Sequence, residues 1–182
     1  VKNRIFMPPI STNMADKGYV TDDLVAHYSA RAKGGVGLIV TEVVTVEPTY
    51  VYLPGDMSIY DDSFIPGWKK LVDGVHQYGT KILAQLFHPA YMAFPVPGTP
   101  QLIAPSCVGP YYAQSAPRPA TIEELHTIVD QFGQAAHRVQ IAGGDGVEIQ
   151  CAHAHGLLGG FLTPLYNKRT DEYGGNIDGR LR

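Results

Sequence analysis

The chain has 182 residues, 45% hydrophobic and 17% charged, a composition typical of one globular domain, which excludes an intrinsically disordered chain. Its formal net charge is −3 and it has no Lys/Arg-rich run, so we expect no nucleic-acid partner. No apolar stretch approaches the roughly 18 to 20 residues that span a bilayer, so we expect no membrane insertion. Only Cys107 and Cys151 occur, which excludes a disulfide framework. One bridge could form between them, but we expect reduced thiols and a cytoplasmic location.

Four short runs rich in apolar and β-branched residues are predicted to be buried strands, and helical patterns follow the first three. Because strands and helices alternate, the sequence predicts a parallel sheet with right-handed crossovers, which is an α/β fold. The predicted strands cover residues 4–10, 36–44, 81–87 and 146–152.

Each predicted helix has residues that favour its ends. Thr21 is the expected N-cap of the first helix, and Gly34 ends it. Pro66 near the start and Gly79 after the end bound the second helix. The third helix opens on a T-x-x-E capping box at residues 121–124.

The segment 95–119 holds seven of the 14 prolines among Gly, Ser and Tyr, and it is predicted to be one long irregular loop. Loops of this length that follow a strand are usually functional. Tyr111 and Tyr112 either form a wall of a substrate pocket or are exposed, and the sequence leaves both interpretations open.

Polar residues cluster where the predicted strands end. In a parallel α/β barrel the reactive groups lie at the carboxyl ends of the strands, so four strands would bring hydrogen-bonding groups to one rim. These residues are Ser11 and Thr12, Thr41 and Glu42, Gln85 and His88, and Gln150, Cys151, His153 and His155.

His153 and His155 are two residues apart, so in an extended chain both rings would point the same way, as a metal site or a pair of proton donors requires. Two structural histidines are a third interpretation. A metal-dependent hydrolase would need His88 or Cys151 as a third ligand, but no carboxylate stands at the spacing of H-E-x-x-H. We therefore predict no metal site.

Five stretches spread over the whole chain share motifs with one enzyme family. They are V-K-N-R-I and M-P-P-I-S-T within residues 1–12, T-D-D-L and A-R-A-K-G-G-V-G-L-I within 19–42, Q-L-F-H-P at 85–89, D-G-V-E-I at 145–149 and N-K-R-T-D-E-Y-G-G at 167–175. The last motif is the most specific. Together they make the chain resemble the old yellow enzyme family of FMN-dependent oxidoreductases.

This resemblance implies a TIM-type (βα)8 barrel with FMN at its carboxyl rim. It also implies hydride transfer from NADH or NADPH through the flavin to an activated C=C bond of a small enone, dienoyl or steroid-type molecule. By position it assigns Pro9, Ile10 and Ser11 to the strand edge that meets the flavin, and Val43 to a place near the ring. Gln85 would pair with the pyrimidine edge, which suits an amide that offers both a donor and an acceptor.

The chain departs from the family after the fourth predicted strand. The family pattern there is H-x-x-(H/N)-G-Y, whose first polar residues bind the substrate carbonyl and whose Tyr donates a proton, whereas this chain reads Q-C-A-H-A-H. In the preferred alignment Gln150 and His153 bind the substrate and His155 replaces the Tyr as proton donor. An alternative alignment places His155 at the family's second His and leaves Leu157 at the Tyr. Tyr91, in an altered motif after the third strand, is a second candidate donor.

A complete barrel takes about 250 residues, and residues 1–182 supply four βα units, as the N-terminal part of a single FMN-binding barrel domain. The phosphate-binding residues usual near the last two strands are not among them. We therefore expect a fragment of a longer enzyme, followed in one branch of the family by iron–sulfur and FAD domains beyond Arg182. The alternative is a non-catalytic half-barrel whose open edges assemble with a second copy.

Overall fold

The chain divides into two compact units, which are described separately. The computed structural model describes residues 1–94, 98–109 and 116–182. The first unit comprises Val1–Glu47, Leu53–Phe87 and Asp130–Ile149. The second unit comprises Pro48–Tyr52, His88–Val129 and Gln150–Arg182.

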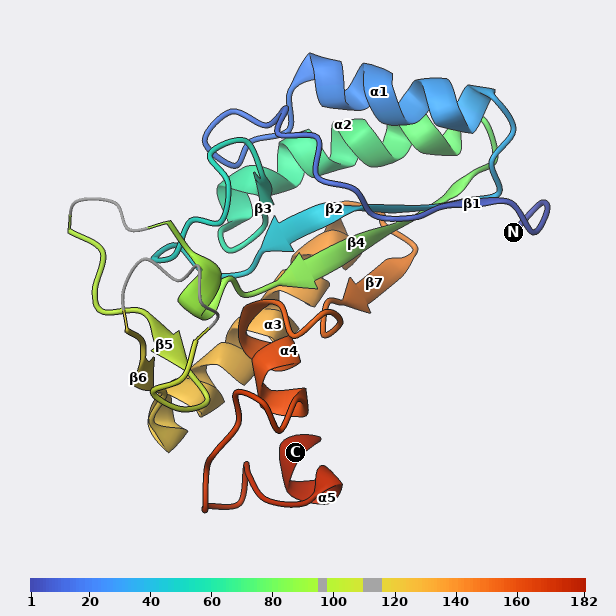
Figure 1. Ribbon diagram of the computed structural model, residues 1–182. Helices are drawn as coiled ribbons and strands as arrows, with labels where there is room; N and C mark the ends of the chain where they lie inside the picture. The colour runs from blue at the N-terminus through green and yellow to red at the C-terminus, as the bar shows by residue number, and fades with distance from the viewer. Residues whose placement is uncertain (95–97, 110–115) are drawn as a thin grey trace. The chain divides into compact units, whose positions relative to one another are not determined.

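A parallel sheet forms the framework of the first unit (Figure 1). Four strands follow one another in the order β1-β2-β4-β7, and each pairs in parallel with the next. A short strand, β3, pairs with the end of β2. The strands are β1 (Phe6–Met7), β2 (Leu38–Thr45), β3 (Met57–Ser58), β4 (Lys81–Phe87) and β7 (Gly146–Ile149).

The predicted parallel α/β arrangement is confirmed, and β4 has its predicted bounds, but two predicted strands are too long. The strand expected at 4–10 is reduced to β1, because Pro8 and Pro9 have no N–H to donate to a sheet. The strand expected at 146–152 ends at Ile149, and a left-handed turn follows at 153–154.

Three helices accompany the sheet. Thr21 caps α1 as predicted, since its Oγ1 accepts the N–H of Leu24 at 3.2 Å. Pro66 lies in the first turn of α2, and the positive φ of Gly79 (66°) lets the chain turn back toward β4. Figure 1 shows α1 and α2 side by side. The helical elements are α1 (Asp22–Lys33), the 3-10 turn η1 (Asp62–Phe64), α2 (Ile65–His76) and α3 (Ile122–Ile141). Only the C-terminal part of α3 belongs to the first unit.

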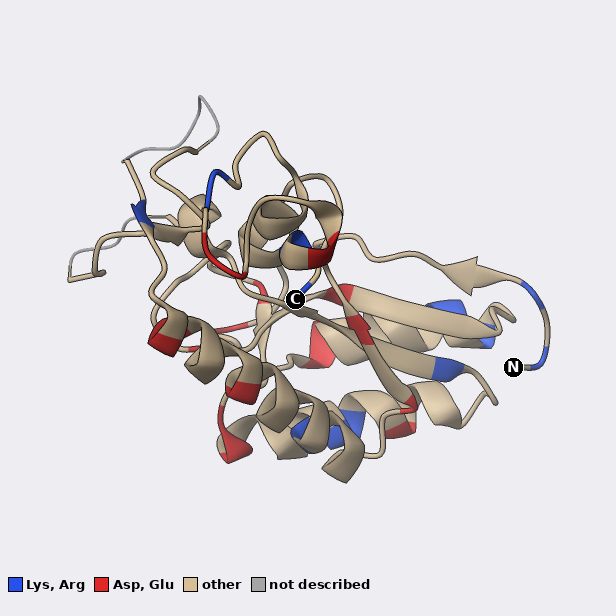
Figure 2. Cartoon of the chain, turned by 90° about the horizontal axis from the view of Figure 1, so that it is seen from below, with Lys and Arg blue, Asp and Glu red and all other residues tan. Residues whose placement is uncertain are grey.

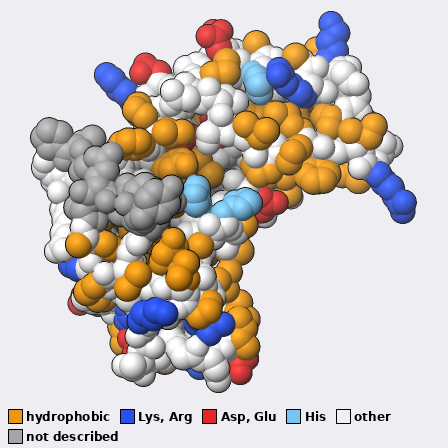
Figure 3. Space-filling model, in the orientation of Figure 1, with side chains coloured by type: hydrophobic (Ala, Val, Ile, Leu, Met, Phe, Trp, Pro, Cys, Tyr) orange, Lys and Arg blue, Asp and Glu red, His pale blue; other side chains and the backbone are white. Residues whose placement is uncertain are grey.

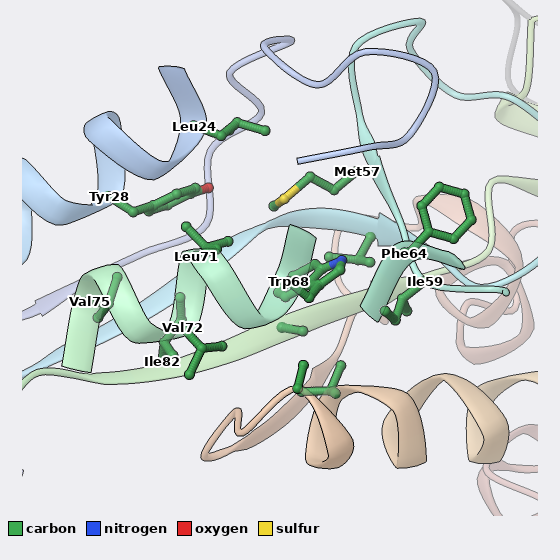
Figure 4. Packing of buried hydrophobic residues seen from close by; sticks show 14 of the residues in the cluster. Leu24, Tyr28, Met57, Ile59, Phe64, Trp68, Leu71, Val72, Val75 and Ile82 are labelled. Atoms are coloured by element: carbon green, nitrogen blue, oxygen red, sulfur yellow. The ribbon is translucent and has the colours of Figure 1, made fainter. Parts of the chain in front are cut away.

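These helices cover one face of the sheet. Ile82, Ala84 and Leu86 alternate along β4 and so face the same side, and all three belong to a buried cluster to which α1, α2 and α3 contribute. Trp68 is buried in this cluster, where its Nε1 donates to the carbonyl oxygen of Ser58 at 3.0 Å (Figure 4). Burial of each large apolar side chain contributes about 1.5–3 kcal/mol. The opposite face of β4 remains available for functional groups.

The second unit consists of short elements. The predicted loop at 95–119 is wrong in part, because β5 and β6 within it form a parallel pair. The N–H of Arg118 donates to the carbonyl oxygen of Leu102 at 2.9 Å, and the N–H of Ala120 donates to that of Ala104 at 2.8 Å. The elements are η2 (Ala90–Met92), β5 (Ile103–Ala104), β6 (Arg118–Pro119), the N-terminal part of α3, α4 (Gly156–Leu162) and α5 (Ile177–Arg180).

The predicted capping box opens α3. The N–H of Glu124 donates to Oγ1 of Thr121 at 3.1 Å, and the N–H of Thr121 donates to Oε2 of Glu124 at 2.8 Å. Arg118 donates two further hydrogen bonds to the same carboxylate, at 2.5 and 2.8 Å. The bonds from Arg118 above all lower the pKa of Glu124 to about 2, so this cap persists into acidic solution.

The motif N-K-R-T-D-E-Y-G-G works as a structural clamp. Arg169 donates through Nη1 to the carbonyl oxygens of Pro105 at 3.1 Å and Ala120 at 2.7 Å, which follow β5 and β6. Its Nε and Nη2 donate to the carboxylate of Asp171. One guanidinium therefore ties the ends of both short strands to the C-terminal loop.

Replacing Arg169 by Lys should lower the free energy of unfolding by about 2–3 kcal/mol, because a single ammonium cannot bridge both carbonyls and Asp171. The Arg169 side chain is only 9% exposed, so water cannot replace its partners. Chemical denaturation measures the loss. The control Arg182→Lys alters an exposed pair with Glu172 at 3.7 Å and should change stability by less than about 0.5 kcal/mol. Equal losses in both variants would contradict the clamp.

Charge is dispersed over the elements. Exposed ion pairs join Lys69 to Asp73 and Lys70 to Asp22, and Figure 2 shows acidic and basic residues interspersed. Over the described ranges, the chain contains no helix with the length and apolarity that a membrane crossing requires.

Candidate functional site

The residues assigned to the flavin all lie in the first unit, near the carboxyl ends of its strands. Pro9, Ile10 and Ser11 follow β1, and Ile10 is 66% exposed, so it offers apolar surface to a ligand. Val43 lies in β2 and Gln85 in β4, where the strand register places them opposite each other. The structure therefore brings these two together.

Glu148 completes a row across three strands, because the register of β4 with β7 places it opposite Gln85. Nε2 of Gln85 donates to Oε1 of Glu148 at 2.6 Å. Sequence reasoning missed Glu148, although a carboxylate within the otherwise apolar V-E-I run was the available signal.

A β-bulge shapes β2 beside this row. The register with β4 shifts between Val40 and Val43, and both intervening residues, Thr41 and Glu42, are fully buried. The backbone N–H of Thr12 donates to Oε2 of Glu42. The strand thereby anchors the segment that follows β1.

Asp56 holds the same segment from a second direction. Its Oδ2 accepts the N–H of Leu53 at 3.2 Å, and the polar side chain of Ser11 interacts with the same carboxyl group. Burial, and then the negative charge of Glu42, raise the pKa of Asp56 to about 7, against the effect of these two interactions. Burial also raises the pKa of Glu42, and the interaction with Thr12 opposes this shift. Within the described part, Oδ1 of Asp56 and Oε1 of Glu42 have no hydrogen-bond partner.

Two buried carboxyl groups that repel each other thus hold the segment with the predicted flavin contacts. This arrangement costs stability when both groups are ionised. Perturbed carboxyl pairs of this kind concentrate at functional sites. Asp56 carries no local sequence pattern that could have predicted it.

Asp56→Asn should change how stability depends on pH. Because the folded pKa of about 7 lies above the unfolded value of 3.8, the native state binds the proton more tightly, and stability falls as pH rises between these values. The neutral Asn removes this fall. The free energy of unfolding of the variant, relative to that of the wild type, should therefore increase from pH 4 to pH 7.5 when it is measured by urea unfolding. A constant difference at all pH values would contradict the assignment. Asp16→Asn, at an exposed carboxyl, is the control.

The remaining candidates lie in the second unit. Tyr91 is buried, and its hydroxyl donates to the carbonyl oxygen of Ala154 at 2.5 Å. A Cβ on Gly160 would lie 2.9 Å from that hydroxyl oxygen, so only glycine fits there. The Tyr91 hydroxyl is therefore closely enclosed.

The expectation that His153 and His155 lie on an extended chain is wrong. His153 and Ala154 have positive φ angles of 63° and 54°, so the backbone makes a left-handed turn, and His155 directly precedes α4. The two rings nevertheless lie 6.1 Å apart at 77°, and Tyr52 lies edge-on to His155 at 6.4 Å. Burial, and then the charge of His153, lower the pKa of His155.

The other predicted substrate residues give less geometry. Gln150 donates from Nε2 to the carbonyl oxygen of Ala152 at 3.5 Å. Tyr111 and Tyr112 lie outside the described residues, so the prediction about them stays open.

The metal-dependent alternative finds no site in the described ranges, which contain no group of three or more His, Cys, Asp or Glu able to hold a metal ion. His88, one proposed third ligand, is buried, and burial lowers its pKa to about 4. Cys151, the other, is an exposed free thiol, as is Cys107.

Comparisons with known proteins agree with this architecture. Residues 1–182 match the NADH:flavin oxidoreductase / NADH oxidase family. The chain is 39% identical over 185 residues to an NADH oxidase of Thermoanaerobacter brockii, covering all of this chain and 28% of that protein. It is 36% identical over 184 residues to an NADPH dehydrogenase of Listeria monocytogenes, covering all of this chain and 53% of that protein. Its structure superposes on that of morphinone reductase with a TM-score of 0.91 at 31% identity, covering 98% of this chain and 52% of that one.

The chain belongs to the old yellow enzyme family of NADH:flavin oxidoreductases. Its parallel α/β fold corresponds to about half of the barrel in the family's solved structures, which confirms the predicted fold class. The chain spans about half the length of the NADPH dehydrogenases that it matches.

Proposed function

We propose that residues 1–182 form the FMN-binding N-terminal half of a barrel that transfers hydride from NADH or NADPH to an activated C=C bond of a small enone, dienoyl or steroid-type molecule. The observation that carries this proposal is the row of Val43, Gln85 and Glu148 at one level of the sheet. It places an amide on the face opposite the buried core, in the unit that also carries the exposed Ile10.

This chain's residues fit the ring part of a flavin. Gln85 pairs its amide with the polar edge of the ring, while Pro9, Ile10 and Val43 supply apolar contact. FMN, when bound, supplies the hydride carrier between the nicotinamide and the substrate.

Three polar residues are assigned to the substrate. Gln150 and His153 hydrogen-bond the substrate carbonyl, and His155 donates the proton that completes reduction of the double bond. The Tyr91 hydroxyl already donates to Ala154, which favours His155 as the donor. The cytoplasmic location and the iron–sulfur and FAD domains beyond Arg182 stay predictions.

Flavin titration of the 182-residue protein tests the cofactor assignment. Free FMN fluorescence should be quenched on saturable binding, and Gln85→Ala should weaken binding about 10-fold, as expected for the loss of a buried hydrogen bond. Gln77→Ala, at an exposed glutamine after α2, is the control and should leave binding unchanged. A folded full-length protein that binds no FMN would overturn the proposed function.

In the full-length enzyme, His155→Phe should slow substrate reduction by about 10²-fold and leave the flavin content unchanged, because it removes only the proton donor. The pKa of His155 is lowered, and its titration determines how turnover depends on pH. The imidazolium is present only below that pKa, so donor-limited turnover falls as pH rises. Stopped-flow measurement of the two half-reactions separates this effect from flavin reduction by NAD(P)H. His126→Phe, at an exposed position on α3, is the control.

Self-assembly is a second candidate function, favoured by the sheet edges. In the described part, β1 and β7 each pair with one neighbouring strand, and such edges template pairing with another chain. Exposed apolar side chains accompany them, Phe6 at 56% and Ile149 at 49%, and Figure 3 shows hydrophobic side chains along the β1 segment. Light scattering together with flavin titration of residues 1–182 should then find a dimer or aggregate that binds no FMN, whereas a monomer that binds FMN rejects this candidate.

A further inference from the structure

We propose that Glu148 is a positioning residue that fixes the orientation of the Gln85 amide, so that its carbonyl oxygen is the group offered to the flavin. The inference rests on the proposed function, because it concerns how Gln85 meets FMN. It adds a residue that neither the sequence motifs nor the comparisons assign.

The two side chains are brought together by backbone register. Leu83 lies opposite Gly146 and Leu86 opposite Ile149, which fixes Gln85 directly opposite Glu148. Opposed residues of neighbouring strands point to the same side of the sheet. For this pair it is the side opposite the buried cluster that contains Ala84.

The chemistry of the contact determines which way the amide turns. An ionised carboxylate only accepts hydrogen bonds, so the amide group that faces Glu148 at 2.6 Å must be the NH2 of Gln85. Without such a partner the two ends of a Gln amide are nearly interchangeable in shape. A bond to a carboxylate is also roughly twice as strong as one between neutral groups, so the orientation is firmly held.

The orientation has a consequence for ligand recognition. The pyrimidine edge of an isoalloxazine ring presents the N3–H donor between two carbonyl acceptors. With the NH2 directed at Glu148, the Oε1 of Gln85 is left to accept a hydrogen bond, and the matching ligand group is N3–H. Because Gln85 is only 7% exposed, its amide is held in place before a ligand arrives, which reduces the entropy lost on binding.

A merely structural role for Glu148, as a stabiliser of β7, predicts something different. In that case, replacing Glu148 would weaken the binding of every flavin equally, whatever group the ring carries at N3. A positioning role acts only through the hydrogen bond that Gln85 makes. The two roles therefore separate in a ligand that lacks N3–H.

The experiment compares the dissociation constants of FMN and N3-methyl-FMN, which has no N3–H, in four proteins. In the wild type the methyl analogue should bind about 10-fold more weakly than FMN, as expected for one lost hydrogen bond. The ratio of the dissociation constant of N3-methyl-FMN to that of FMN should fall to about one in Gln85→Ala. In Glu148→Gln this ratio should lie between the value for Gln85→Ala and that for the wild type. In the double variant, Glu148→Gln should add nothing to the loss from Gln85→Ala, because both act through one contact.

Glu148→Gln is nearly isosteric and neutral, so it keeps the volume of the side chain while removing the carboxylate. Urea unfolding checks that each variant is folded. Glu123→Gln, at an exposed position in the first turn of α3, is the matched control and should leave both constants unchanged.

The outcomes separate this inference from the proposed function. If the folded full-length wild type binds no FMN, the proposed function fails and the inference fails with it. If Gln85→Ala lowers the ratio but Glu148→Gln leaves it unchanged, or the two effects are additive, the positioning role alone is overturned. A lowered ratio in Glu148→Gln with no further effect in the double variant supports it.

Discussion

The parallel pairing of β2, β4 and β7 is the constraint on which the rest of the first unit depends. Main-chain hydrogen bonds set Val43, Gln85 and Glu148 at one level, and the alternation along β4 sends Ala84 and Leu86 to the opposite face. A slip of one residue would exchange the two faces, so the apolar core and the polar row specify the same register. Stability and the arrangement of the site therefore have a common cause.

The bulge in β2 lets one strand both contribute to the core and anchor a neighbouring segment. It lets Thr41 and Glu42 both be buried while Val44 returns to the core, and Glu42 then anchors the segment after β1. The raised pKa of Asp56 shows that this anchoring opposes stability at neutral pH. A fold selected for stability alone would place apolar side chains at the positions of Glu42 and Asp56. This carboxyl pair is therefore better explained by the function of the segment that it anchors.

What the sequence could predict follows from how local each cause is. Thr21 and the capping box at 121–124 act within one helical turn, so the starts of α1 and α3 were predictable. The strands β5 and β6 have two residues each, too few to leave a periodic pattern, so their pairing was not predictable. The bond between Gln85 and Glu148 depends on register between strands, and the left-handed turn at 153–154 uses residues that rarely adopt it.

The two most informative stretches of the sequence carry different kinds of information. In N-K-R-T-D-E-Y-G-G every role found is structural. Arg169 ties the loop to the ends of β5 and β6, and Asn167 donates to the carbonyl oxygens of Phe161 in α4 and of Tyr173. A Cβ on Gly174 would collide with the carbonyl oxygen of Arg169. Such a motif identifies the family without determining its chemistry. Residues 150–155 are the reverse, since they depart from the family pattern just where the backbone turns left-handed and two imidazoles meet. Differences in substrate between this chain and its relatives should therefore arise at this turn, while the row of Val43, Gln85 and Glu148 that we propose for the flavin can stay the same.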